Sequence, residues 1–396
     1  MYTLLAVVAV LTSLFVVRNV DLRVYWYGVN GFFAGIRPAY GPGSGLGFPM
    51  EYRYPPVTYI LLFPLKWMSL GVAGFWWMLA AWSMVLVAVS LAIRMRRLRF
   101  SRNSILAAGA FMLAYVVLAI RYGNVQPFVI AWIFAALVLS ETYPVITGIL
   151  LALAVTFKIW PVMFLPWLFH RERRKAIAYF VVWFVALWML PVPIFGATRY
   201  WDLLKEWYTA VGRVGTTYSE FYYFPGQSLR GLLLRYFTPV PPPLKNFPDV
   251  HVLSLSPHSA VIAWMVIGIG VYSLFVIQML RSDSRKLWAW DGLAFVLYSM
   301  LEPYAVKSGL ISLGPAALTG ACLLTLGTTR GIQSTRNSWA NRLFLAACAI
   351  SFFEAILQYK PWQRFLLSIG LDFWAEALLL AALFIWIVLT DLPEST

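Results

Sequence analysis

A carboxylate stands close to the end of the first apolar run, at a point where a substrate on a membrane surface would reach it. Asp21 follows residues 1–17 and lies between Arg18 and Arg23. Desolvation in an apolar rim raises the proton affinity of a carboxylate, which suits it to take a proton from a hydroxyl. The carboxylate could also stabilise the positive charge that develops on a sugar ring in an oxocarbenium-like transition state. The alternative is an acid in the first turn of an interfacial helix, stabilised by the helix dipole.

A second acid lies in the segment "EYRYPP", residues 51–56. Tyr54 is expected to be extended because a proline follows it. Glu51 has two interpretations, which stay open: it holds substrate hydroxyls, or it pairs with Arg53 on the loop surface. The aromatic residues after Asp21, which begin with Tyr25, are expected to lie mostly on one face of an interfacial helix and to act mainly as a membrane anchor.

Two polar interruptions follow in apolar sequence. The notch "RYGNVQPF", residues 121–128, contains Asn124 and Gln126 and is either a simple turn or a ligand contact. Lys158 interrupts "AVTFKIWPVMF", where a charge is costly and usually functional. Lys158 therefore either binds a lipid phosphate or snorkels to the interface.

Two later segments offer further cations. "FPGQSLRGLLLR", residues 224–235, is expected to form a helix near the outer surface, and arginine is a natural phosphate partner. The alternative is a basic helix lying on anionic headgroups. "LEPYAVKS", residues 301–308, supplies Glu302 and Lys307, for which the alternative is an ion pair with no further role. The predicted substrate-binding residues are Arg23, Tyr25, Glu51, Arg53, Tyr54, Asn124, Gln126, Lys158, Gln227, Ser228, Arg230 and Lys307.

Composition defines the scaffold that must position these residues. The 396 residues are 61% hydrophobic and 12% charged, about half the charge of a soluble domain. We therefore predict an all-α polytopic membrane protein, because helices satisfy their own backbone hydrogen bonds in lipid. The net charge of +15 is assigned to cytosolic loops rather than to nucleic-acid binding. The cysteines and histidines show no ligand spacing, so no metal site is predicted.

Four basic loops, at residues 94–102, 170–175, 281–286 and 330–342, set the predicted topology with both termini in the cytosol. About a dozen crossings are expected in one domain, residues 1–396. Residues 18–70 form a first external loop with interfacial or re-entrant helices, and 196–258 a second long external loop. The predicted apolar segments are 1–17, 71–93, 104–120, 126–140, 145–157, 159–169, 176–195, 259–280, 287–301, 310–326, 343–357 and 371–390.

The order of these motifs resembles a known family. Asp21 after the first span, an aromatic helix, "YRYPP", "GNVQPF", "GILLALAVTFKIWPVMFLPWL" and "GQSLRGLLLR" resemble the GT-C superfamily, and more narrowly glycosyltransferase family 87, the polyprenol-phosphate-mannose-dependent mannosyltransferases. The resemblance covers roughly the first 240 residues. Many members carry a Ser-Pro-x-x-Trp-x-His segment in a late outer loop, where this chain has "LEPYAVKSG".

The resemblance implies an inverting transfer in which Asp21 is the catalytic base. The donor would be a polyprenyl-phosphate sugar, its phosphate held by Lys158 and the Gln227–Arg230 segment, and the acceptor a glycolipid or glycan. Neither a nucleotide nor a tightly bound metal would be needed, and no nucleic acid would be a partner. The resemblance also implies a multi-pass protein of the plasma membrane, among membrane lipids, with its active site on the extracytoplasmic side.

Other functions predict different patterns. A transporter or flippase of lipid-linked glycans would carry ionisable residues deep within its spans, in pseudo-symmetric halves. Here only Asp291 and Glu354 are expected well inside apolar stretches, each near a span end. A purely structural assembly partner would not call for Asp21 and Lys158 at their positions, although an inactive homologue would retain both.

Overall fold

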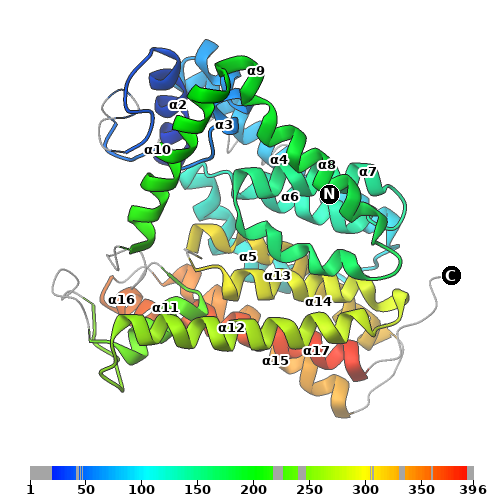
Figure 1. The fold of residues 1–396 in the computed structure, drawn as a ribbon. Helices are drawn as coiled ribbons and strands as arrows, with labels where there is room; N and C mark the ends of the chain where they lie inside the picture. The colour runs from blue at the N-terminus through cyan, green and yellow to red at the C-terminus, as the bar shows by residue number, and fades with distance from the viewer. Residues whose placement is uncertain are drawn as a thin grey trace. The chain divides into compact units, whose positions relative to one another are not determined.

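The computed structural model describes residues 20–41, 44, 46, 48–216, 226–239, 247–303, 305, 307–329, 335–357 and 360–389. Every regular element among these residues is a helix, which confirms the all-α class (Figure 1). The predicted span at 1–17 lies outside the described residues. So do parts of the glycine-rich loop, the 196–258 segment, the 301–308 turn and the 330–342 loop, and the last residues, "DLPEST".

Six helical segments of the described chain are long and apolar enough to cross a membrane. They confirm a polytopic membrane protein, while the prediction of about a dozen crossings stays a prediction. Shorter apolar helices cover 126–139, 144–157 and 160–169. The six segments are Leu70–Met95 (α4), Arg102–Tyr122 (α5), Lys175–Phe195 (α8 and α9), Pro257–Leu280 (α12), Gly309–Leu326 (in η6 and α14) and Leu371–Val388 (in α17).

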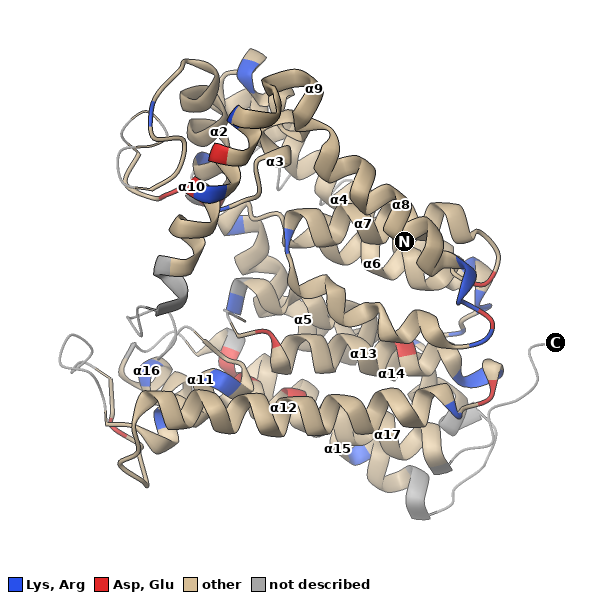
Figure 2. Cartoon of the chain, viewed as in Figure 1, with Lys and Arg blue, Asp and Glu red and all other residues tan. Residues whose placement is uncertain are grey.

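The exposed faces of these helices are apolar, as a lipid environment requires. Val182 on α8 (Lys175–Met189) is 61% exposed, and Val266 on α12 is 67% exposed. Most charged residues lie at or near helix ends, while α8 is uncharged along most of its length (Figure 2).

The chain forms two compact units. Unit 1 comprises Met1–Leu91, Ala119–Leu168 and Glu172–Thr217, and unit 2 comprises Ala92–Leu118, Phe169–Arg171 and Tyr218–Thr396. The hydropathy pattern, which predicted a single domain, contains no signal for this division. The candidate residues are therefore described for each unit separately.

The segment of unit 1 before α4 contains three short helices, α2 (Val20–Phe33), α3 (Val57–Leu61) and η1 (Phe63–Trp67). The short helices α3 and η1 follow Pro56, and their re-entrant or surface placement stays a prediction. The prediction that the aromatic stripe of α2 is mainly a membrane anchor is wrong for Tyr25, which is buried. Tyr25 is 2% exposed, and Phe32 stacks on Tyr59 at 4.1 Å between ring centroids. These rings pack inside the segment because α2 lies directly against residues 51–59.

A glycine permits that close approach. A Cβ atom on Gly28 would lie 2.5 Å from Cδ2 of Tyr52. The Tyr52 ring has little freedom to yield, since it stacks on Tyr59 at 4.5 Å and its hydroxyl pairs with Thr58 Oγ1 at 2.7 Å.

Gly28→Ala is therefore expected to destabilise the protein by about 1–3 kcal/mol, because it overpacks a filled contact. Thermal unfolding in nanodiscs measures the effect. The matched control is Gly109→Ala, a helical glycine of α5 with no atom within 4 Å of the added Cβ. Equal unfolding temperatures for the two variants would show that Gly28 is not a packing requirement.

Helices α6 (Gln126–Leu139) and α7 (Pro144–Phe157) form an antiparallel hairpin in unit 1. Thr147 Oγ1 donates a hydrogen bond to the carbonyl of Ala136 at 3.1 Å, which fixes the register. Both helices rise by the same amount per residue, so Gln126 at the start of α6 lies level with Phe157 at the end of α7. Lys158 follows in an extended conformation, and two 3-10 helices, η2 (Trp160–Phe164) and η3 (Pro166–Phe169), continue the chain. The predicted interruption of the apolar run at Lys158 is confirmed.

The remaining helix of unit 1 is α10 (Ala197–Thr216), which follows α9 (Pro191–Phe195). Unit 2 is built around α13 (Leu287–Leu301), α14 (Gly314–Thr329), α15 (Thr335–Ile356) and α17 (Leu371–Leu389), with α15 packed along α17. Its shorter helices are α11 (Leu229–Phe237), η5 (Ser284–Lys286), η6 (Lys307–Leu313) and α16 (Lys360–Ile369).

Candidate functional site

Asp21 and Lys158, which are far apart in the sequence, are electrostatic neighbours in unit 1. Asp21 lies in the first turn of α2 and is partly buried. Burial raises the pKa of Asp21 to about 6, and the nearby Lys158 ammonium partly opposes that rise. A carboxylate with this pKa is ionised near neutral pH and still holds a proton well, as a general base should.

Tyr25 connects Asp21 to the turn between α5 and α6. It lies one helical turn after Asp21 on the same face of α2. Its hydroxyl accepts a hydrogen bond from the backbone N–H of Val125 at 3.1 Å and pairs with the Tyr54 hydroxyl at 2.9 Å. Burial raises the pKa of Tyr25 well above its usual value, so the phenol stays protonated. The structure thus brings two predicted residues, Tyr25 and Tyr54, to the Asp21 site.

The end of the α6–α7 hairpin that carries Lys158 also carries buried polar groups. The Gln126 side chain is fully buried there, and neither its oxygen nor its nitrogen has a hydrogen-bond partner among the described residues. Thr156, two residues before Lys158, is equally buried, and its hydroxyl is equally unpaired. Nothing in the sequence pattern distinguishes Thr156 from a core threonine, so it was missed.

The other predicted residues of unit 1 lie around this site or have backbone roles. Asn124 Oδ1 accepts the backbone N–H of Gln126 at 3.0 Å. The Arg53 side chain is exposed, and its carbonyl accepts the Trp207 indole N–H at 2.9 Å. Arg23 is exposed and lies over the Phe48 ring at 5.9 Å. Glu51 is half-buried in the same loop.

The predicted residues near α11 contribute to the packing of unit 2. Gln227 donates its backbone N–H to Ala305 at 2.7 Å. Ser228 caps α11 by accepting the N–H of Gly231. Arg230 is 7% exposed and lies 5.6 Å from the Trp264 ring centroid. A helix forms in the predicted segment, but it begins at Leu229, so Gln227 precedes it and Ser228 is its N-cap, while its predicted place near the outer surface stays a prediction.

Lys307 belongs to a buried cluster of acids that the sequence analysis did not foresee. Its Nζ lies 2.6 Å from Glu354 and 3.8 Å from Asp372. Tyr115 donates a hydrogen bond to Asp372 at 2.8 Å. Glu376, one turn further along α17, is fully buried. The expectation that only Asp291 and Glu354 lie inside apolar stretches is therefore wrong, because Asp372 and Glu376 stand within a candidate span.

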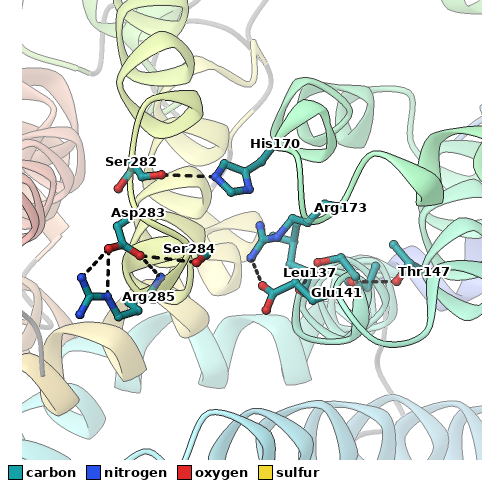
Figure 3. A network of polar contacts seen from close by, with 11 residues as sticks. Leu137, Glu141, Thr147, His170, Arg173, Ser282, Asp283, Ser284 and Arg285 are labelled. Carbon is teal, nitrogen blue, oxygen red and sulfur yellow. Dashed lines mark hydrogen bonds and ion pairs between the residues drawn. The ribbon is translucent and has the colours of Figure 1, made fainter. Parts of the chain in front are cut away.

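The basic loops predicted to be cytosolic contain local contacts (Figure 3). In unit 1, fully buried Arg173 pairs with Glu141 at 3.2 Å. In unit 2, Asp283 pairs with Arg285 at 2.6 Å, and His170 contacts the carbonyl of Ser282 at 3.3 Å. These contacts order the loops. Over the part of the chain that the structure describes, no group of three or more His, Cys, Asp or Glu residues is arranged to hold a metal ion.

The fold is that of a multi-pass membrane protein, and the Asp21 site holds a partly buried carboxylate under the electrostatic influence of Lys158. Residues 52–289, more than half of the chain, match the family model described as Glycosyltransferase family 87. The chain belongs to this family and is therefore a glycosyltransferase. The match covers Gln126 and Lys158; it begins after Asp21 and ends before Lys307.

One relative of known activity is similar to part of the chain. It is the "Polyprenol-phosphate-mannose-dependent alpha-(1-2)-phosphatidylinositol mannoside mannosyltransferase" of Mycolicibacterium smegmatis (strain ATCC 700084 / mc(2)155). The two proteins are 28% identical over 174 residues, or 39% of each chain, so the chain matches about two fifths of the relative's length. No solved structure matches the chain.

Proposed function

We propose that this glycosyltransferase moves a hexose, most simply mannose, from a polyprenyl-phosphate donor to a hydroxyl of a glycolipid or glycan acceptor, with inversion. The observation that supports this reaction is the electrostatic influence of a cation on a partly buried carboxylate. Asp21, with a pKa of about 6, has the Lys158 ammonium as its neighbour in a chain of family 87. The relative's dependence on polyprenol-phosphate-mannose supports the choice of donor.

In the proposed step, Asp21 acts on the acceptor hydroxyl and Lys158 acts on the leaving phosphate. The acceptor oxygen attacks the anomeric carbon while the bond from that carbon to the phosphate oxygen breaks. The acceptor proton passes to Asp21, and the bond electrons leave with the polyprenyl phosphate, whose new negative charge Lys158 stabilises. Attack on the side opposite the leaving group inverts the anomeric centre.

Several accessory assignments belong to the same proposal. Tyr25, Tyr54, Asn124 and Gln126 would contact the substrates around Asp21, and Arg23, Glu51 and Arg53 would do so from the external loop. Gln227, Ser228, Arg230 and Lys307 remain proposed donor contacts of unit 2. The reaction would need no nucleotide and no tightly bound metal, and no nucleic acid would be a partner. The site would face the extracytoplasmic side of the plasma membrane.

A transfer assay tests the reaction class. The purified protein in nanodiscs is incubated with radiolabelled polyprenyl-phosphate-mannose and a lipid or glycan extract of the host. We expect label to appear in a product more polar than its acceptor, and the anomeric configuration of the product to be opposite to that of the donor. Donor binding without transfer would point to another acceptor, and retention of configuration would contradict the mechanism.

The pH dependence of transfer tests the Asp21–Lys158 pair. Only the ionised carboxylate accepts a proton, so kcat/KM should rise with pH through about 6 in the wild type. Lys158→Gln removes the positive charge that favours the ionised form, so the rise should move to higher pH and the KM for the donor should increase. Lys158→Arg, which keeps the charge, is the control. An unchanged pH profile in Lys158→Gln would separate Lys158 from the base.

One observation favours the transport of lipid-linked glycans as a second candidate. Asp372 and Glu376 lie buried within a candidate span, where a transporter places ionisable groups. Vesicles that hold the protein and a fluorescent lipid-linked glycan distinguish the two activities. Movement of the lipid between leaflets without sugar transfer would favour transport.

A further inference from the structure

Among the buried polar side chains of unit 1, three near the Asp21 site have unpaired atoms, although burial of such atoms costs free energy unless something pairs with them. Gln126 and Thr156 have no exposed surface, and Trp77 is 8% exposed. The amide oxygen and nitrogen of Gln126, the hydroxyl of Thr156 and the indole nitrogen of Trp77 all lack a hydrogen-bond partner among the described residues. Such groups point to a ligand that supplies the missing hydrogen bonds.

The three side chains belong to one end of the unit. The hairpin register places Gln126 level with Phe157, next to Thr156. Trp77 extends from α4 and contacts Tyr25, with 5.1 Å between the ring centroids. Since Tyr25 accepts the N–H of Val125, the residue before Gln126, the unpaired atoms lie beside the Asp21 site.

Aromatic rings connect these polar groups. Trp77 contacts Phe128 at 4.8 Å, Phe128 contacts Trp132 at 5.9 Å, and Trp132 contacts Phe157 at 5.4 Å between centroids. Binding sites for small ligands combine apolar and aromatic walls with a few placed polar groups. A hexose matches this set, because its C–H faces pack on aromatic rings while its hydroxyls both donate and accept hydrogen bonds.

We propose that Gln126, Thr156 and Trp77 form the subsite that binds the hydroxyls of the transferred hexose. The proposal rests on the proposed function for the identity of the sugar carrier. A carboxamide donates and accepts at once, so Gln126 would pair with two neighbouring hydroxyls, and Thr156 and Trp77 with a third. A sugar that lacks one of these hydroxyls would leave a buried group unpaired and would be rejected.

The test compares ligands with and without the sugar, in nanodiscs free of glycoside detergents. The first pair of probes is polyprenyl-phosphate-mannose and polyprenyl phosphate. The second is a short-chain alkyl mannoside and its 2-deoxy analogue, which need no phosphate. Affinity is read from the ligand-dependent shift in unfolding temperature. The wild type should prefer each mannose-bearing probe by about tenfold or more.

The variants Gln126→Leu and Thr156→Val should each reduce that preference to less than about twofold, while the affinity for polyprenyl phosphate stays unchanged. Without ligand, neither variant should be less stable than the wild type, because each removes an unpaired buried group. Thr147→Val is the matched control. Thr147 is also fully buried in α7, but its hydroxyl bonds to Ala136, so this variant should lose stability and keep the sugar preference.

The results of these binding experiments distinguish an error in the proposed subsite from an error in the proposed reaction. If neither polyprenyl lipid binds but the alkyl mannoside binds the wild type and not Gln126→Leu, the subsite stands and the proposed donor is wrong. If the wild type prefers neither mannose-bearing probe, or if Gln126→Leu keeps the preference, the subsite is wrong even where transfer is observed. A variant that is less stable without ligand and still sugar-selective would assign Gln126 to a water-bridged structural role.

Discussion

Asp21→Asn is expected to lower the rate of sugar transfer by about 100- to 10,000-fold, the usual contribution of a general base. The amide has nearly the shape of the carboxyl group but cannot take the acceptor proton. Donor binding, measured by the shift in unfolding temperature, should persist. The control is Asp202→Asn, which changes an exposed acid of α10 that pairs with Lys205 at 3.8 Å. Equal transfer by wild type and Asp21→Asn would remove Asp21 from the mechanism.

The same substitution should make the protein more stable at high pH. Burial raises the pKa of Asp21 from 3.8 to about 6, so the folded state holds this proton more tightly than the unfolded chain. The folded state therefore loses stability as pH rises from about 4 to 6, and the full cost, of the order of 3 kcal/mol, is present above that range. Asparagine never ionises and escapes this cost.

Thermal unfolding in nanodiscs at pH 4 and pH 8 measures the difference. Wild type and Asp21→Asn should unfold at similar temperatures at pH 4, and the variant at a higher temperature at pH 8. Loss of activity together with this gain in stability would identify a carboxylate that is held at an energetic cost for its chemistry. A variant that is less stable at pH 8 would show that the ionised carboxylate makes contacts that stabilise the fold.

Lys307→Met is expected to destabilise the protein by about 3–5 kcal/mol, because it leaves the buried acids without the cation that the structure pairs with them. Lys307 lies within ion-pair distance of Glu354 and Asp372, whose side chains are 4% and 1% exposed. Thermal unfolding again provides the measurement. Lys205→Met is the control, since an ion pair whose side chains are 62% and 52% exposed contributes little.

A second substitution separates the two roles open to Lys307. If it mainly balances buried charge, Glu354→Gln in the Lys307→Met background should recover part of the lost stability, because one fewer charge is left unbalanced. If it mainly binds the donor phosphate, Lys307→Met should keep its stability and lose donor affinity. The double variant would then recover nothing.

The local features of the fold could be predicted from sequence because they depend on neighbouring residues. Lys158 and Pro161 interrupt an apolar run, and the helix ends at Phe157 as expected. Asp21 falls in the first turn of α2, the position that the alternative interpretation gave it. The proximity of Asp21 to Lys158 depends on packing between distant segments, which hydropathy does not encode.

The features that the sequence did not predict have identifiable structural causes. The close packing of α2 on residues 51–59, which buries Tyr25, depends on the absence of a side chain at Gly28, and that effect appears only when its neighbour Tyr52 is known. Asp372 and Glu376 were overlooked because the apolar residues around them dominate the average hydropathy of α17. Thr156 differs from Thr147 only in whether its hydroxyl finds a partner, a property of the folded chain.

The boundary between the two units limits how segments of this chain can be exchanged with a homologous protein. The boundary falls after Leu91 within α4 and after Leu118 within α5, so each of these helices contributes residues to both units. Neither unit is one continuous stretch of chain. A single genetic crossover therefore cannot transplant the Asp21 site into a relative without cutting a helix or leaving part of the unit behind. Variation in acceptor or sugar is then expected to arise by substitution inside a fixed architecture, rather than by exchange of whole modules.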